Sequence, residues 1–333
     1  MRTDRRVLYR RESHIYGSEI HTCGGSERRW VAEVDGQHRE ACYNVAVQVP
    51  ESSLDELRER GFALVRGFLD ADELAAAQEA LWNEFPRPAD YFADPSRYER
   101  FTHSQFAGLK VGPWRSWDLN RLAFHPDLVD LAARFLDSSD LRLYKTELWA
   151  KYAGAVDYDQ PHHRDFGNHT LVVPDRTCPA TQMTTFLLLS DVTADDGPTM
   201  VVPYEHGAAI PYWPPKQAMG DLADVEVAVT GPAGSLFVYR TDILHRGSQI
   251  RRAGAARFVL LADYEVWGAR WTGKVAWPHH ALGAAWVEMM ERATPAERCL
   301  FGFPAPGDPY WNVQTVADVG ARYPQMDMAP YLA

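Results

Sequence analysis

Residues 181–203 read TQMTTFLLLSDVTADDGPTMVVP, in which two apolar runs flank the turn sequence Asp195-Asp196-Gly197-Pro198. β-Branched and aromatic residues favour strands, whereas Asp, Gly and Pro favour turns. The same pattern recurs in LRLYKTELWAKY (141–152), DVEVAV (224–229), SLFVYR (235–240) and ARFVLLADYEV (256–266). Because these runs follow one another without helices between them, they favour a sandwich or barrel over a doubly wound parallel sheet. We therefore expect a jelly roll, which can leave a pocket inside.

Helical patterns lie on either side of this β region. Ser53 and Glu56 fit a capping box that opens a helix ending near Gly61. Further helices are predicted over 70–85, 126–136, 281–293 and 312–323. The sequence thus predicts a mainly β protein with helical additions (α+β). We expect one domain over 1–333, with an N-terminal arm over 1–50, a jelly-roll core over about 140–268 and a C-terminal helical cover over 269–333.

The composition disfavours several classes of protein. Of the 333 residues, 46% are apolar, which allows a sizeable core, and the formal net charge of -11 argues against binding to nucleic acid or to an anionic membrane. The basic start MRTDRR lacks the apolar stretch of a secretory signal, and no run reaches the roughly 18 to 20 apolar residues of a membrane span. The four cysteines, Cys23, Cys42, Cys178 and Cys299, form no CxxC motif, so we expect free thiols and a cytoplasmic location.

The stretch QPHHRDF (160–166) contains His163 and Asp165, two residues apart. On an extended backbone such residues point to the same side, so an imidazole and a carboxylate can reach one ion. The alternative is an ordinary surface ion pair. His245 supplies a second imidazole just before a turn. Two histidines and one carboxylate leave about three positions of an octahedral iron(II) ion open, as in non-haem iron oxygenases. A structural zinc site would instead fill its positions, usually with cysteine.

Arg257 adds a third element, because it opens the apolar run FVLLADY twelve residues after His245. A buried strand is a costly place for a cation unless its planar guanidinium meets a carboxylate. The distal carboxylate of 2-oxoglutarate would be such a partner. The alternative is an arginine at a strand end whose head reaches solvent.

These pieces form an ordered set that resembles the phytanoyl-CoA dioxygenase (PhyH) family of iron(II)/2-oxoglutarate oxygenases. The set comprises His163-Arg164-Asp165, TTFLLLSDVTADDGPTMVVPYEHG (184–207), Gly231-Pro232-Ala233-Gly234-Ser235-Leu236-Phe237, Leu244-His245-Arg246-Gly247-Ser248 and Arg257, and the resemblance covers roughly residues 53–265. It implies a cupin-like double-stranded β-helix, Fe(II) held by His163, Asp165 and His245, and 2-oxoglutarate and O2 as co-substrates.

Further residues are candidates for holding the oxoacid. The family often places a serine two residues after the second histidine, whereas here that position is Gly247 and the serine is Ser248. Gln182 and Thr184 alternate along a predicted strand, so both would face the interior of the barrel. The alternative is that they are ordinary polar strand residues.

Four residues are candidate substrate contacts. Lys151 and Asn168 lie near the metal motif in sequence, and Trp114 and Arg115 belong to an aromatic and basic cluster. Stacked Trp and Arg side chains suit a planar or carboxylated ligand. The alternatives are solvated surface residues and packing between helices and the barrel.

We therefore predict an iron(II)- and 2-oxoglutarate-dependent dioxygenase that hydroxylates an unactivated C–H bond of a small-molecule metabolite and releases succinate and CO2. Related halogenases replace the metal carboxylate by a small residue, so Asp165 disfavours halogenation. The alternative function is a non-catalytic jelly-roll module that binds or senses a metal through the same three residues. Arg257 and the intact Asp165 favour the enzyme. The sequence identifies neither the substrate nor an oligomeric state.

Overall fold

The chain divides into two compact units, Met1–Gln48 and Val49–Ala333. The computed structural model describes residues 29–34, 37–42, 49–165, 180–212, 222–269, 275–280 and 283–332. In the first unit, β1 (Arg29–Val34) and β2 (Gln37–Cys42) pair as an antiparallel hairpin. The second unit contains the candidate site. The single domain expected over 1–333, with an arm over 1–50, stays a prediction.

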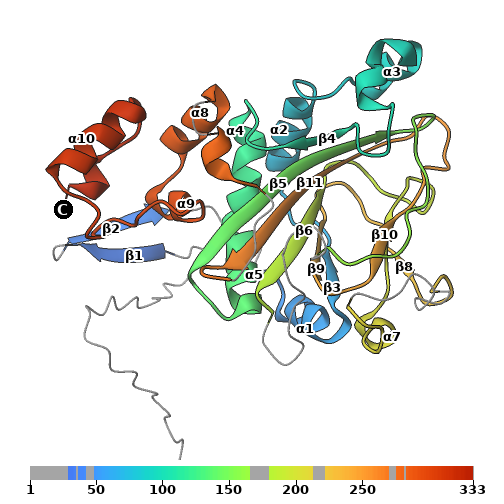
Figure 1. Ribbon diagram of the computed structural model, residues 1–333, viewed down its shortest axis with the longest axis horizontal. Coiled ribbons are helices and arrows are strands. Elements are labelled where there is room, and N and C mark those ends of the chain that lie inside the picture. The colour runs from blue at the N-terminus through green and yellow to red at the C-terminus, as the bar shows by residue number, and fades with distance from the viewer. Residues whose placement is uncertain are drawn as a thin grey trace, which may run out of the picture. The chain divides into compact units, whose positions relative to one another are not determined.

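A six-stranded antiparallel sheet runs through the second unit in the order β3-β9-β6-β11-β5-β4 (Figure 1). Its strands are β3 (Phe62–Val65), β4 (Leu109–Val111), β5 (Leu141–Tyr152), β6 (Gln182–Leu188), β9 (Leu236–Arg240) and β11 (Ala256–Val266). The long strands β5 and β11 pair along their whole length, and β5, β6, β9 and β11 fall within the predicted strand-like runs. Because β5 and β11 are rich in aliphatic and aromatic residues, they can be buried on both faces.

A smaller antiparallel sheet has the order β10-β7-β8. It consists of β7 (Thr199–Val201), β8 (Val227–Ala228) and β10 (His245–Gly247). In Figure 1, β8 and β10 lie on the opposite side of the large sheet from α4 and α8. An apolar cluster that includes Phe186, Phe237, Leu261 and Val201 draws side chains from both sheets. This arrangement is the predicted jelly roll.

Alternation along β5 sorts its side chains between the two faces of the large sheet. Leu148 and Ala150 belong to the apolar cluster that the helices share, whereas Trp149 belongs to the cluster inside the jelly roll. Lys145, Glu147 and Lys151 have the same parity as Trp149, so they also face the interior. The inner face of β5 is therefore unusually rich in charge.

Several helices pack on the outer face of the large sheet, whereas α7 lies beside the small sheet (Figure 1). The α-helices of the described residues are α1 (Glu51–Arg60), α2 (Ala71–Leu81), α3 (Pro88–Ala93), α4 (Trp117–Asn120), α5 (Pro126–Leu136), α7 (Tyr204–Gly207), α8 (Ala284–Arg292), α9 (Pro295–Cys299) and α10 (Val313–Arg322). Buried side chains of α1, α2, α5 and α8 complete the outer apolar cluster. None of the helices among the described residues is long and apolar enough to cross a membrane.

The helix boundaries confirm most predictions and correct one. The helix predicted to open at Asp70 does so with a capping box between Asp70 and Glu73, and α1 ends at Gly61 in the left-handed conformation. The capping box predicted at Ser53 and Glu56 is wrong. Helix α1 begins at Glu51, after Pro50 and without a side-chain cap. The Ser53 amide donates to the Pro50 carbonyl at 2.9 Å, so Ser53 already lies inside the first turn and cannot cap it.

Candidate functional site

Two histidines are brought together by one pair of backbone hydrogen bonds. His245 is the first residue of β10, and His163 forms an isolated antiparallel bridge with it. The His163 amide donates to the His245 carbonyl at 2.9 Å, and the His245 amide donates back at 3.0 Å. The two rings lie 4.5 Å apart. Residues widely separated in sequence thus become neighbours whose side chains project to the same side.

Asp165 completes the group, because possible ligand atoms of the three residues all lie within 4.8 Å of one another. The Asp165 Oδ1 atom is 3.5 Å from His245 Nε2 and 3.9 Å from His163 Nε2. Each histidine turns its other nitrogen to the backbone: Nδ1 of His163 lies 3.0 Å from the Pro161 carbonyl, and Nδ1 of His245 lies 3.3 Å from the Ile243 carbonyl. These contacts favour a proton on Nδ1 and leave both Nε2 lone pairs facing the carboxylate.

Tyr239 fixes the orientation of the Asp165 carboxylate. This buried residue of β9 donates its hydroxyl to Asp165 Oδ2 at 2.6 Å. Burial and the neighbouring Asp165 carboxylate raise the pKa of Tyr239 well above its usual value, so the hydroxyl keeps its proton and remains a donor. With Oδ2 engaged, Oδ1 is the oxygen presented to the histidines. No sequence pattern indicates this contact, because a tyrosine in an apolar strand also fits ordinary packing.

The electrostatics of the group suit a divalent cation. Burial, followed by the neighbouring His245, lowers the pKa of His163 and so favours the neutral ring that a metal needs. Burial also lowers the pKa of His245, but the Asp165 carboxylate more than offsets this and leaves that pKa raised. The His163 side chain is 42% exposed, so one side of the group is open. Two imidazoles and one carboxylate with an open side fit iron(II).

Arg257 is a buried cation with unused donors. It is only 2% exposed, and its Nη1 donates to the Gly197 carbonyl. Within the described part of the chain, its Nε and Nη2 have no hydrogen-bond partner. Burial lowers the pKa of Arg257 to about 10, a value at which the group is still charged at neutral pH. A ligand carboxylate would satisfy both the charge and the donors.

Arg257 is connected to β10 through the turn at Gly197 and Pro198. Gly197 and Pro198 precede β7, which pairs with β10, and the Ser248 hydroxyl donates to the Pro198 carbonyl at 2.6 Å. That contact uses the only hydroxyl hydrogen of Ser248, so in this arrangement Ser248 can only accept a hydrogen bond from a ligand. Its role as an oxoacid contact stays a prediction.

Lys151 places a second cation beside Arg257, its partner across the β5–β11 pairing. Its ammonium group donates to the Ser248 carbonyl at 2.9 Å and pairs with Asp157 at 2.5 Å. Burial and the positive charge of Arg257 lower the pKa of Lys151 to about 8. Its position suits a ligand anion near Arg257 as well as the substrate role predicted for it.

A row of polar side chains crosses the inner face of the large sheet. The register pairs Tyr239 with Thr184, Thr184 with Asp263 and Asp263 with Lys145. Lys145 lies 2.8 Å from the Asp263 carboxylate and 3.3 Å from that of Glu147. Gln182 is buried one step further along β6, and its amide nitrogen has no hydrogen-bond partner among the described residues. Gln182 and Thr184 thus lie inside the jelly roll, and their contact with the oxoacid stays a prediction.

The other predicted substrate contacts are not brought to this interior. Trp114 is buried on the outer face of the large sheet, beside Thr146 and Leu143, and Arg115 is exposed. Their positions lend no support to a substrate role. Asn168 lies outside the described residues. Of the cysteines, Cys299 is a free thiol, and the side chains of the other three are outside the described part.

Comparisons with known proteins agree with this fold. The sequence model of the phytanoyl-CoA dioxygenase (PhyH) family matches residues 57–258. No curated protein sequence matches the chain. Among solved structures, EctD from S. alaskensis with 2-oxoglutarate and 5-hydroxyectoine is 20% identical and aligns with a TM-score of 0.50 over 66% of this chain and 76% of that chain. HygX from Streptomyces hygroscopicus, with nickel and 2-oxoglutarate bound, is 16% identical, with a TM-score of 0.49 over 67% of this chain and 90% of that chain.

We predict that His163→Ala, Asp165→Ala and His245→Ala each lower the affinity for Co(II), a spectroscopic probe of the site, by more than roughly 100-fold, because loss of an outer partner alone costs roughly 10- to 100-fold. Titration followed by the visible absorption of Co(II) measures this. His206→Ala is the matched control, since that histidine is 47% exposed and lies beside Glu205. Unchanged affinity in the three variants would contradict the assignment.

We also predict that Tyr239→Phe weakens Co(II) binding by roughly 10-fold, because Asp165 loses the donor that orients it. The ring itself, stacked 5.0 Å from that of Phe237, is retained. Tyr152→Phe is the control: it also removes a tyrosine hydroxyl, one that donates to the Pro86 carbonyl at 2.7 Å in the outer cluster. Equal metal affinities in the two variants would show that the hydroxyl does not position Asp165.

Proposed function

Because this chain belongs to the phytanoyl-CoA dioxygenase family, we propose that it is a hydroxylase in which His163, Asp165 and His245 bind Fe(II) and Arg257 binds 2-oxoglutarate. The family uses Fe(II), 2-oxoglutarate and dioxygen. The proposed reaction inserts oxygen into an unactivated C–H bond of a small-molecule metabolite and releases succinate and CO2. Family membership spans residues 57–258, which include all four residues.

The iron, when bound with 2-oxoglutarate and dioxygen, would supply the oxidising power that breaks the C–H bond. The protein's part is positioning. Tyr239 holds Asp165 so that one oxygen is presented to the metal. The backbone carbonyls that contact Nδ1 of each histidine orient the ring so that Nε2 points toward the metal position. Burial of His245 and partial burial of Asp165 limit water on their side of the centre, while the exposed side of His163 leaves a way in for substrate.

The observation that carries the proposal is the pair of unsatisfied donors on the buried Arg257. Buried donors without acceptors cost free energy, so such a group is expected to have a ligand. Nη1 donates to the Gly197 carbonyl, whereas Nε and Nη2, which have no partner among the described residues, lie on the planar edge that binds a carboxylate with two hydrogen bonds. A non-catalytic metal module has no use for such a clamp, which favours the oxygenase over that alternative.

Hydroxylation is the reaction that we favour within this class. Asp165 occupies the position that a halide takes in related halogenases, which disfavours halogenation. Enzymes of similar fold catalyse several outcomes, and their names include an epimerase and a carbocyclase, SnoN and SnoK from nogalamycin biosynthesis. All of these reactions can begin with removal of a hydrogen atom, so the outcome depends on how the substrate is placed.

The interior also favours a polar substrate. Buried ion pairs seldom stabilise a fold more than apolar side chains of similar size would, so the Lys145, Asp263 and Glu147 group calls for another use. It lies on the same inner row as Tyr239, which contacts Asp165. We propose that polar groups of the substrate bind there.

We predict slow formation of succinate from 2-oxoglutarate under air with Fe(II) and ascorbate, even without the substrate. His163→Ala should abolish it. Arg257→Ala should raise the KM for 2-oxoglutarate by roughly 30-fold or more, because loss of one partner of a buried charge pair costs about 2–5 kcal/mol. Mass spectrometric detection of succinate measures the turnover.

Arg292→Ala is the control for this experiment, because Arg292 is half-exposed and pairs only weakly with Glu288. Anaerobic titration of the Fe(II) protein with 2-oxoglutarate, followed by its visible charge-transfer absorption, detects binding where turnover is slow. A protein that binds the metal but shows neither succinate nor this absorption would contradict the oxygenase proposal and favour the non-catalytic module.

The pH dependence of oxoacid binding gives a separate prediction. The pKa of Lys151 is lowered to about 8, and an anion bound nearby would raise it again. Below pH 8 Lys151 is already protonated, but above pH 8 binding requires uptake of a proton. The affinity for 2-oxoglutarate should therefore fall by up to roughly tenfold per pH unit above pH 8. Lys151→Met should bind more weakly at pH 7 and lose this additional dependence; identical slopes in both proteins would exclude Lys151 from the oxoacid site.

A further inference from the structure

The residues next to the two metal-site histidines meet at one buried carboxylate. His162 adjoins His163 and Arg246 adjoins His245, and alternation turns both side chains away from the metal side. Glu226, just before β8, accepts from both. His162 Nε2 lies 2.9 Å from Glu226 Oε2, while Arg246 donates Nε to Oε2 at 2.8 Å and Nη2 to Oε1 at 2.5 Å.

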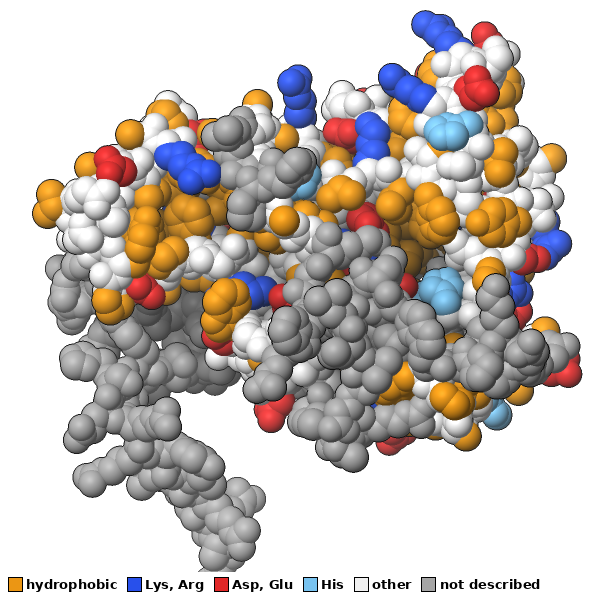
Figure 2. Space-filling view, viewed as in Figure 1, with side chains coloured by type: hydrophobic (Ala, Val, Ile, Leu, Met, Phe, Trp, Pro, Cys, Tyr) orange, Lys and Arg blue, Asp and Glu red, His pale blue; other side chains and the backbone are white. Residues whose placement is uncertain are grey.

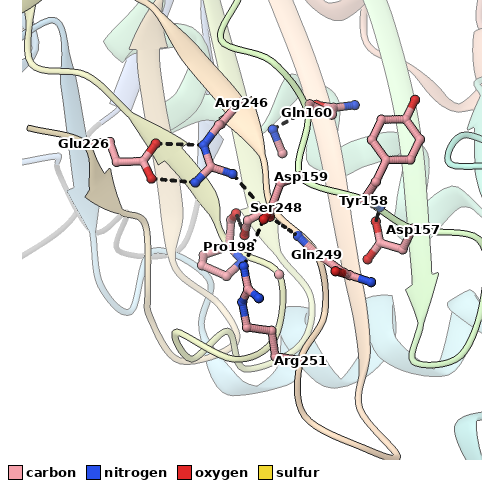
Figure 3. A network of polar contacts seen from close by, with 12 residues as sticks. Asp157, Tyr158, Asp159, Gln160, Pro198, Glu226, Arg246, Ser248, Gln249 and Arg251 are labelled. Atoms are coloured by element: carbon pink, nitrogen blue, oxygen red, sulfur yellow. Dashed lines mark hydrogen bonds and ion pairs between the residues drawn. The ribbon is translucent and has the colours of Figure 1, made fainter. Parts of the chain in front are cut away.

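This contact spans the width of the small sheet. Arg246 pairs with Met200 of β7, and Met200 pairs with Ala228 of β8, so Glu226 reaches back across β7 from the far edge. Figure 3 shows the two-pronged contact between Glu226 and Arg246 and its continuation to Asp159. Arg246 Nη1 lies 3.2 Å from Asp159 Oδ1, four residues before His163. The segment that carries His163 is thus bound to Glu226 in two ways: directly through His162, and through Arg246, which also contacts Asp159.

The Glu226 side chain is only 6% exposed, which gives these contacts more weight than surface ion pairs have. Burial alone would raise the pKa of Glu226. Its bonds with Arg246 and His162 lower the pKa by more than burial raises it, so the net pKa lies below the usual value. The carboxylate is therefore charged at neutral pH. A two-pronged bond between arginine and carboxylate fixes direction as well as distance.

From this geometry we propose that Glu226 is a positioning residue that sets the spacing of the two metal-binding histidines. It acts through His162 and Arg246 and touches neither ligand. With the backbone bridge fixing the main chains, Glu226 would limit how far the two strands can rotate and so keep both Nε2 atoms within reach of one ion. The proposal rests on the metal centre of the proposed function. Outer contacts of this kind tune metal affinity in many metalloenzymes.

The test measures Co(II) binding to the full-length protein by titration, together with the visible absorption spectrum at saturation. Glu226→Gln keeps the size of the side chain but removes its charge. We expect it to weaken Co(II) binding by roughly 10- to 100-fold and to change the spectrum, which reports ligand geometry. Glu226→Asp, which keeps the charge, should recover part of the affinity.

Glu79→Gln is the control, because Glu79 also binds an arginine: Nη2 of Arg87 donates to both of its carboxylate oxygens, at 2.8 and 3.1 Å, on an exposed surface. It should leave the affinity and spectrum unchanged. Arg246→Lys serves as a second variant if Glu226→Gln fails to fold, since it keeps a cation but loses the two-pronged geometry. Its affinity should fall in the same way.

Co(II) affinities of Glu226→Gln and Arg246→Lys within about twofold of the original, with an unchanged spectrum, would overturn the proposal. Failure of the unaltered protein to bind Co(II) would overturn both this proposal and the metal centre. Normal Co(II) binding without succinate formation would contradict only the proposed function. The readout is therefore independent of turnover.

Discussion

The site depends on the reciprocal backbone bridge between His163 and His245. Other bonds also tie the segment after β5 to the small sheet, but this bridge is the one that places His163 directly beside His245. The bridge fixes three things at once: the distance between the two imidazoles, the side on which they project, and the position of Asp165 two residues later. His245 is also a buried residue, and a buried backbone donor is costly to leave unpaired. The same bonds that stabilise the fold thus build the metal centre.

The interior of the jelly roll departs from an ordinary apolar core. Its middle is filled by Phe186, Phe237 and Leu261, but charged residues lie on either side of them along the inner face. Arg257 and Lys151 occupy one end, and Lys145 with Asp263 the other. On the face shown in Figure 2, basic side chains of the described residues are scattered among acidic and apolar ones. The concentrated charge is inside, where low polarity strengthens its interaction with a bound anion or cation.

Much of this could be predicted from local patterns. Helix α5 and strands β5 and β11 have the boundaries that their periodicity indicates, and the spacing of His163, Asp165, His245 and Arg257 identified the chemical class. The contacts that orient the site could not be predicted. Tyr239 reads as a core residue of an apolar strand and Glu226 as an outward-facing strand residue. Their partners lie 74 and 64 residues away, so only the three-dimensional pairing of strands reveals them. The strands β4 and β10 could not be predicted for a different reason: each has only three residues, which is too few for a clear alternating pattern.

The segment before His163 has one more consequence. Strand β10 is the outer strand of the small sheet, and besides the bridge to His163 three amides in and after it donate to side chains of the segment before His163. The amides of Gly247, Gln249 and Ile250 donate in order to the side chains of Gln160, Asp159 and Asp157. Figure 3 shows the contact between Gln249 and Asp159. An unpaired strand edge invites pairing with another chain, and proteins commonly protect such edges. Here the segment that carries His163 and Asp165 protects the edge of β10. Loss of order in this segment would therefore disrupt the metal site and also expose a strand edge that can pair with another chain, so loss of the site and aggregation would arise together.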